Sequence, residues 1–150
     1  RCAPYHNWEE FIEEAGPGIT ESKDGFWKPV TDDRITALMP LSASGEWLFG
    51  SRGLASSDKA IMMTAGTDEG VRYEECYQIF EELGTSNKLF ISFVEADHYM
   101  IFGEDAPKKM KHLAIAFFSY YLKGYETYAD FFSEEFISRT EGLAWYKFEE

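Results

Sequence analysis

Residues 59–70 read KAIMMTAGTDEG, residues 88–98 read KLFISFVEADH, and these two stretches decide the fold. Each is a mostly apolar run without clean alternation, which is typical of strands covered on both faces, as in a parallel sheet. Between them, apolar residues recur at helical spacing and stop at Gly84. These helical positions are Tyr73, Cys76, Tyr77, Phe80 and Leu83. The order strand, helix, strand predicts an α/β fold with a parallel sheet.

Further elements extend this pattern on both sides. Residues 35–41 (ITALMPL) predict an earlier strand, and an apolar stripe after Asp105-Ala106-Pro107 predicts a helix that ends near Gly124. A second helical stretch is expected at 126–136. We therefore divide the single predicted domain into a helix (8–15) and loop over 1–31, the sheet region over 32–125, and a C-terminal extension over 126–150.

Composition excludes several classes of function. The 150 residues carry a formal charge of −13, which argues against nucleic acid and anionic membrane surfaces as partners. No apolar run is long enough to predict a membrane span. Cys2 and Cys76 lack metal-ligand spacing and leave open either one disulfide or two free thiols. The compartment also stays open, with an extracellular or periplasmic location favoured.

Polar side chains follow the second and third predicted strands, where ligands bind in open α/β sheets. Asp68 comes directly after one strand and His98 directly after the next. Because neighbouring strands lie about 4.8 Å apart, the two side chains are expected to form a hydrogen bond. A carboxylate that accepts the imidazole N–H holds the histidine in the tautomer that a general base requires. Asp68 and His98 are therefore the predicted catalytic residues.

The order of these motifs resembles the last third of the α/β-hydrolase fold. The matching order is strand, GTDEG, helix, strand, ADHYMIF, helix. The stretch Asp33-Arg34-Ile35-Thr36-Ala37 resembles the D-x-R-I-x-A segment of dienelactone-hydrolase-like and platelet-activating-factor-acetylhydrolase-like members. Residues 114–122 (AIAFFSYYL) resemble their final helix. The resemblance covers residues 32–125.

This resemblance implies a serine-dependent carboxylic-ester hydrolase without a metal or organic cofactor, acting on a small neutral or hydrophobic ester. In the family the triad follows the chain order serine, acid, histidine. The 150 residues contain no G-x-S-x-G nucleophile elbow and no recognisable oxyanion-hole segment. We therefore expect the chain to be the C-terminal half of the fold. A companion polypeptide or upstream segment would then carry the N-terminal half and the serine.

Three alternatives stay open at this point. Many family members place the acid three residues after the strand-end glycine, which is Glu69 here, so Glu69 is the alternative to the favoured Asp68. Trp47 and Phe49 follow the first strand and are candidates for an acyl pocket, although packing in a core is an equal explanation. A non-catalytic subunit or binding module that retains the hydrolase shape is the alternative function.

Overall fold

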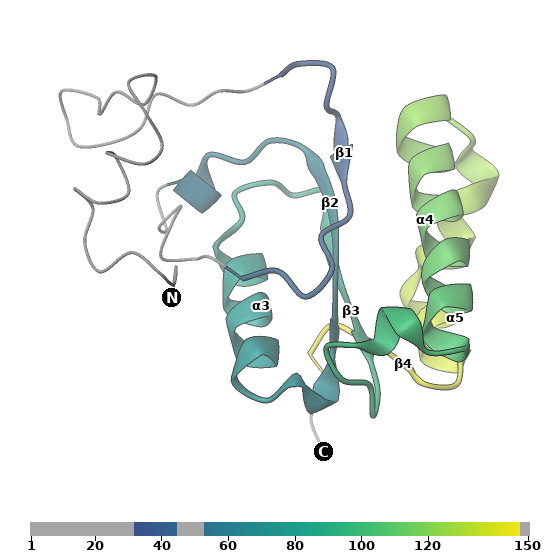
Figure 1. The fold of residues 1–150 in the computed structure, drawn as a ribbon. Coiled ribbons are helices and arrows are strands. Elements are labelled where there is room, and N and C mark those ends of the chain that lie inside the picture. Colours follow the sequence, from purple (N-terminus) through teal and green to yellow (C-terminus); the bar gives the residue numbers. More distant parts are fainter. Residues whose placement is uncertain (1–31, 45–52, 148–150) are drawn as a thin grey trace, which may run out of the picture. The chain divides into compact units, whose positions relative to one another are not determined.

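The computed structural model describes residues 32–44 and 53–147 (Figure 1). The chain divides into two units, 1–33 and 34–150, and every helix and strand given below belongs to the second. The helix and loop expected within residues 1–31 lie outside the described residues. Within the described part of the chain, no helix is long and apolar enough to cross a membrane.

The sheet has four strands in the order β1 (Ala37–Leu38), β2 (Ala60–Gly66), β3 (Lys88–Phe93) and β4 (Leu143–Trp145). The first three are parallel, and β4 pairs with β3 in the antiparallel sense. The predicted α/β fold with parallel strands and flanking helices is confirmed, and the antiparallel β4 was not predicted. β1 is much shorter than the expected strand at 35–41, and Pro40, which lacks an N–H donor, interrupts the ladder there.

Helices cover both faces of the sheet. α3 (Val71–Glu82) lies on one face, and α4 (Asp105–Lys123) and α5 (Glu134–Arg139) lie on the other (Figure 1). Successive residues of a strand point to opposite faces of the sheet, so they pack alternately against α3 and against the α4 and α5 side. On the α3 side the buried strand residues are Ile61, Met63, Ala65 and Phe90. On the α4 side they are Ala60, Met62, Leu89, Ile91 and Phe93. This burial on both faces explains why the strands read as continuous apolar runs.

The C-terminal extension is part of this fold. The single helix expected at 126–136 is instead a 3₁₀ segment, η3 (Glu126–Phe132), followed by α5. Ser133 separates them, because its hydroxyl accepts a hydrogen bond from the Phe136 N–H and so caps α5. Phe132, Ile137 and Leu143 join the core formed with α4. The extension then returns as β4, which covers the outer edge of β3.

Candidate functional site

The loops that follow β2 and β3 lie against each other at the carboxyl edge of the sheet. Gly66, the last residue of β2, pairs with Phe93 at the end of β3. A Cβ atom on Gly66 would lie 2.1 Å from the Ala96 carbonyl oxygen, so only glycine permits this approach. The Asp68 N–H donates to the same oxygen at 3.0 Å. The two loops are therefore held in one fixed arrangement.

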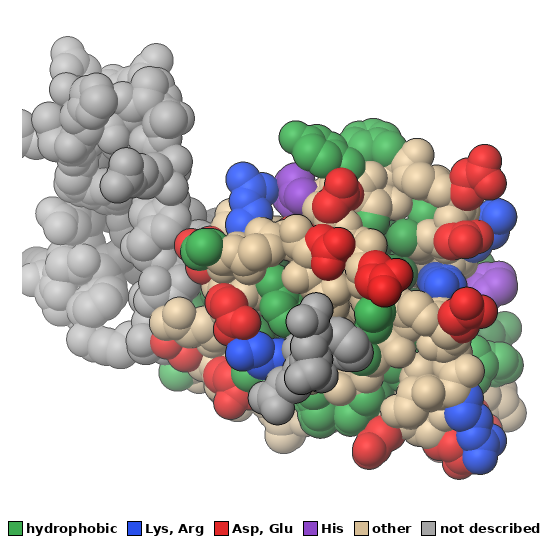
Figure 2. Space-filling view, turned by 90° about the horizontal axis from the view of Figure 1, so that it is seen from below, with side chains coloured by type: hydrophobic (Ala, Val, Ile, Leu, Met, Phe, Trp, Pro, Cys, Tyr) green, Lys and Arg blue, Asp and Glu red, His purple; other side chains and the backbone are tan. Residues whose placement is uncertain are grey.

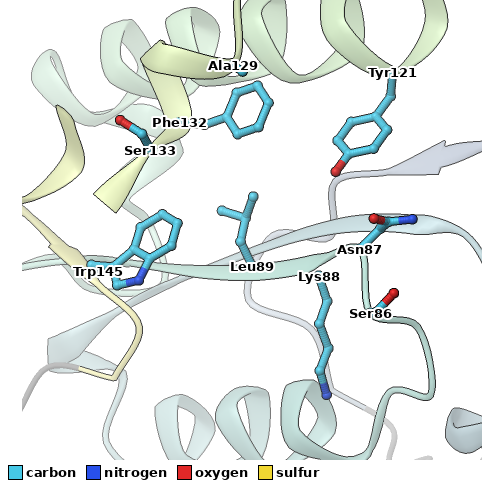
Figure 3. Close-up of a pocket in the computed structure, with 9 residues that line it drawn as sticks. All are labelled: Ser86, Asn87, Lys88, Leu89, Tyr121, Ala129, Phe132, Ser133 and Trp145. Atoms are coloured by element: carbon cyan, nitrogen blue, oxygen red, sulfur yellow. The ribbon is translucent and has the colours of Figure 1, made fainter. Parts of the chain in front are cut away.

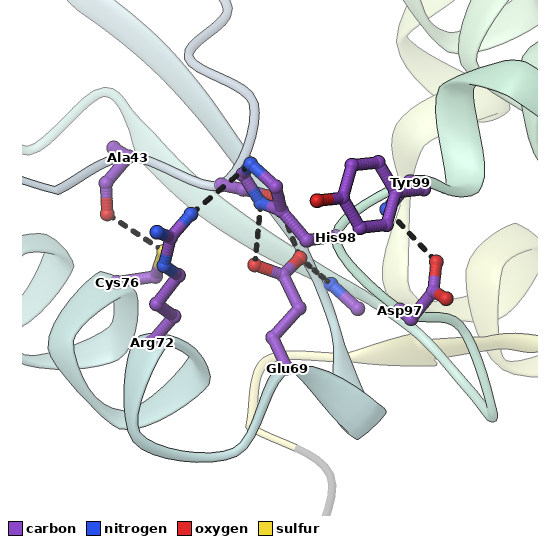
Figure 4. Close-up of polar contacts among 9 residues, drawn as sticks. Ala43, Glu69, Arg72, Cys76, Asp97, His98 and Tyr99 are labelled. Atoms are coloured by element: carbon purple, nitrogen blue, oxygen red, sulfur yellow. Dashed lines mark hydrogen bonds and ion pairs between the residues drawn. The ribbon is translucent and has the colours of Figure 1, made fainter.

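Glu69 is the carboxylate at the centre of the site. The residues Thr67–Glu69 form a 3₁₀ turn, η1, in which residues three apart lie above one another. Glu69 therefore lies over Gly66, whose N–H donates to Oε1 at 2.8 Å. The Ser42 hydroxyl donates to the same oxygen at 2.5 Å, and Oε2 lies 3.2 Å from His98 Nδ1 (Figure 4). The Glu69 side chain is fully buried, and its charge is satisfied by these donors.

The favoured pairing of Asp68 with His98 is wrong, and the alternative acid, Glu69, makes the contact. Asp68 is exposed, and among the described residues its carboxylate has one hydrogen-bond partner, the Thr67 hydroxyl at 3.4 Å. In a 3₁₀ turn of three residues, Asp68 is rotated about 120° away from the strand end, whereas Glu69 faces it. The longer glutamate side chain then reaches across to the loop after β3.

His98 is held in one tautomer by its two neighbours. A carboxylate can only accept and a guanidinium can only donate. Nδ1 must therefore carry the proton toward Glu69, and Nε2 must accept from Arg72 Nη1 at 3.1 Å. The imidazole is partly exposed, with 43 % of its side-chain area accessible. A neutral imidazole whose Nε2 lone pair faces outward is the form that can remove a proton from a hydroxyl.

Sequence reasoning missed Ser42 and Arg72. Ser42 follows β1 with a φ of 46°, an uncommon conformation outside glycine, and its N–H donates to the Thr64 carbonyl. A small polar residue directly after a strand was the available signal. Arg72 lies in the first turn of α3, 26 residues from His98, and no motif marked it. Each of three neighbouring strands is thus followed by a contributor: Ser42, Glu69 and His98.

Two potential nucleophiles near the site, Ser42 and Cys76, are not poised for attack. The Ser42 hydroxyl donates to the acid and not to the base. Cys76 is a free, buried thiol that donates to the Ala43 carbonyl at 2.8 Å. Burial, reinforced by the charges of Glu69 and Glu75, raises the pKa of the Cys76 thiol to about 12. A thiol that stays protonated is a poor nucleophile.

Trp47 and Phe49 lie outside the described residues. His112 is exposed on α4, and among the described residues no ion pair joins it to an acid. Within 32–44 and 53–147, no three His, Cys, Asp or Glu side chains form a group that could hold a metal ion.

Exposed hydrophobic side chains occur close to the candidate base. Tyr99, Ile101 and Phe102 follow it in the chain and are exposed, and Val71, which precedes Arg72, is exposed too. The Tyr99 ring packs edge-on to the imidazole with a centroid separation of 5.7 Å. Figure 2 shows hydrophobic side chains at the upper edge of one face, beside a histidine and close to acidic groups.

A separate pocket of about 250 Å³ lies at the opposite end of β3, between the sheet and the α4 layer (Figure 3). Leu89, Tyr121, Phe132 and Trp145 line it. Lys88 points away from it, toward α3, where its amine donates to the carbonyls of Phe80, Glu81 and Leu83. The pocket therefore lacks an acid–base pair, and it lies at the amino end of the strand, away from His98.

Comparisons with protein-family models and with curated protein sequences found no match to this chain.

Proposed function

We propose that this chain supplies the acid and the base of a serine-dependent carboxylic-ester hydrolase of the α/β-hydrolase type. Glu69 is the acid, His98 is the base, and a segment outside the described residues carries the nucleophilic serine. The substrate is a small neutral or hydrophobic ester.

The observation that carries this proposal is the buried Glu69 carboxylate, which orients His98 with its Nε2 acceptor outward. The arrangement occurs at the carboxyl edge of a parallel sheet, on consecutive strands. A structural histidine has no need of a fully buried carboxylate that is itself held by two further donors. The same arrangement serves to stabilise an imidazolium during proton transfer.

Acyl transfer would proceed in two steps. His98 Nε2 takes the serine hydroxyl proton while the serine oxygen attacks the ester carbonyl, and the imidazolium returns that proton to the departing alcohol. Water then attacks the acyl carbonyl while His98 takes its proton; the acyl–serine bond breaks, the imidazolium returns that proton to the serine oxygen, and the carboxylic acid leaves. Glu69 stays ionised throughout and stabilises the positive imidazolium.

The outer edge of β1 is the site where the companion segment would join the sheet. Among the described residues no strand pairs with this edge. Ile35, Leu38 and Leu41 are exposed along it, which is an aggregation hazard unless another element covers them. A strand that pairs with β1 in the parallel sense would end at the same edge of the sheet as Glu69 and His98, so a serine that follows it would lie near Nε2.

A binding module without catalysis is the second candidate, and one contact favours it. Arg72 Nη1 donates to His98 Nε2, which is the atom that must accept from the serine hydroxyl in catalysis. Catalysis requires Arg72 to swing aside, which its exposed and flexible side chain permits. A binding module has no such requirement.

Fluorophosphonate labelling separates the two candidates, because the reagent modifies only an activated serine. The protein is purified with everything that remains bound to this chain, and intact mass identifies the labelled polypeptide. We expect one labelled serine and hydrolysis of a short-chain aryl ester. His98→Ala should lower turnover by about 10³-fold or more.

The control is His112→Ala, which removes an exposed histidine from α4 and should leave turnover unchanged. If His98→Ala retains more than about a tenth of the activity while folded, the base is misassigned. If no serine is labelled and no ester is hydrolysed, the binding-module candidate replaces the enzyme.

A further inference from the structure

We infer that Arg72, His98 and the exposed apolar side chains beside them bind a monocarboxylate with a linear apolar tail. This inference deepens the proposed function, on which it partly rests, because such an acid is the product released from a medium-chain ester. The ligand's head group would contact Arg72, and its tail would lie across Tyr99 and Phe102.

Arg72 carries the charge that the head group needs. Its guanidinium contacts the neutral imidazole of His98, and among the described residues it forms no ion pair with a carboxylate. Other surface cations of this chain do form ion pairs. Arg139 Nη1, for example, lies 2.7 Å from Glu135 Oε1. A guanidinium binds a carboxylate through two parallel hydrogen bonds, which are stronger than one bond to a neutral ring nitrogen.

The surrounding charges favour a ligand with a single negative charge. Asp68, Glu95 and Asp97 are exposed on the two loops that build the site, and the whole chain carries a charge of −13. An anion can therefore bind only where it touches the guanidinium directly. A second carboxylate on the ligand would face these acidic side chains without a partner, which selects monocarboxylates.

Apolar surface for the tail lies beside this head-group position. Val71 precedes Arg72 and is 77 % exposed, while Tyr99 and Phe102, just after His98, are 68 % and 80 % exposed. The Phe102 N–H donates to the Tyr99 carbonyl in a 3₁₀ turn, where residues three apart lie above one another, so these two exposed rings form one apolar surface. The Tyr99 ring already packs against the imidazole, so the apolar surface begins at the base itself (Figure 4).

Binding of the head group would also change the state of the base. When the guanidinium binds the carboxylate of the ligand, it no longer donates to Nε2. The lone pair of His98 Nε2 then becomes available to another donor. Arg72 therefore has two alternative partners, the imidazole in the free site and a carboxylate in the occupied one.

Titration of sodium alkanoates into the intact protein, followed by NMR of the His98 ring, tests this inference. Octanoate is expected to shift the ring signals and to bind about tenfold more tightly than butanoate. This ratio follows if each of the four added methylenes is roughly half buried. Octanamide has the same tail without the charge and should bind at least fivefold more weakly than octanoate.

Two variants separate the head-group and tail contributions. Arg72→Gln should weaken octanoate and butanoate by the same factor and abolish the preference over octanamide. Phe102→Ser should leave butanoate binding unchanged and reduce the chain-length ratio. The controls are Arg139→Gln, an exposed arginine on α5, and Phe131→Ser, an exposed aromatic on η3. Neither control should change any affinity.

Each outcome decides the inference. Octanoate that binds no better than octanamide, or no better than butanoate, overturns it, as does an unchanged affinity in Arg72→Gln. If hydrolysis depends on His98 but alkanoates do not bind, the inference is overturned and the proposed function stands. Alkanoate binding to a protein that hydrolyses nothing would support the inference and reject the enzyme.

Discussion

Replacement of Glu69 by glutamine tests the geometry of the site without a substrate. The Glu69 carboxylate is fully buried and accepts from Ser42, Gly66 and His98. Glutamine keeps one acceptor oxygen, which can still receive the Ser42 and Gly66 donors. Its amide group then meets the His98 Nδ1–H, donor against donor.

The imidazole can escape that conflict only by changing tautomer. Moving the proton to Nε2 lets Nδ1 accept from the glutamine, but the new Nε2–H then faces the Arg72 guanidinium, which also donates. One of the two contacts of His98 must therefore break. The same change removes the acceptor that the proposed chemistry requires.

The expected cost follows from these contacts. The hydrogen bonds from Ser42 and Gly66 keep an acceptor but lose its negative charge, which costs about 1 kcal/mol for each bond. The lost contact with His98 contributes less, because the imidazole is partly exposed and solvent screens it. Relief from burying a charge offsets part of the loss. We expect Glu69→Gln to lower the free energy of unfolding by about 1–3 kcal/mol.

Urea unfolding measures this cost, and Asp68→Asn is the matched control. Asp68 is exposed and its carboxylate has one long contact, so its variant should change the free energy of unfolding by less than about 0.5 kcal/mol. Nitrogen NMR of the His98 ring should show the proton on Nδ1 in the unmodified protein. The reasoning fails if Asp68→Asn costs as much as Glu69→Gln, or if the proton is found on Nε2.

Three further predictions concern the surroundings of the site. Gly66→Ala should destabilise the protein by more than about 2 kcal/mol, because its Cβ would lie 2.1 Å from a carbonyl oxygen, whereas Gly103→Ala, with its nearest atom at 3.4 Å, should be nearly neutral in thermal unfolding. The Cys76 thiol ionises near pH 9 when unfolded but only near 12 when folded, so the unfolded state loses its proton first and stability falls as pH rises above 9. By pH 10 this loss should reach about 1.4 kcal/mol in urea titrations, and Cys76→Ala should not show it. Leu38→Lys, on the outer edge of β1, should reduce the amount of companion polypeptide that copurifies, while Leu122→Lys, also exposed but on α4, should not; equal amounts with both variants would argue against β1 as the joining edge.

The sequence by itself determined the framework. The apolar runs at 59–67 and 88–96 predicted β2 and β3, because strands buried on both faces cannot alternate between polar and apolar residues. Helical spacing predicted α3 and α4 for a comparable reason, since each must bury one stripe. The position of His98 after a strand was also readable, because the end of a strand defines where its loop begins.

Tertiary structure alone decided which acid meets His98. Asp68 and Glu69 are adjacent, both are acidic, and both follow a strand, so composition does not distinguish them, although the spacing in the resembled family pointed to Glu69. The choice depends on the rotation of a 3₁₀ turn, and the contact between Gly66 and the Ala96 carbonyl sets the position of that turn.

Ser42, Arg72 and β4 were not predicted from the sequence, and the physical reason is the same for all three. Ser42 and Arg72 contact residues 27 and 26 positions away, and neither belongs to a repeating pattern. The three residues of β4 are too few for a period to be detected, and they form a strand because β3 offers an open edge. Local periodicity reports which face of an element is buried, whereas the partner of an individual polar side chain depends on how distant segments pack together.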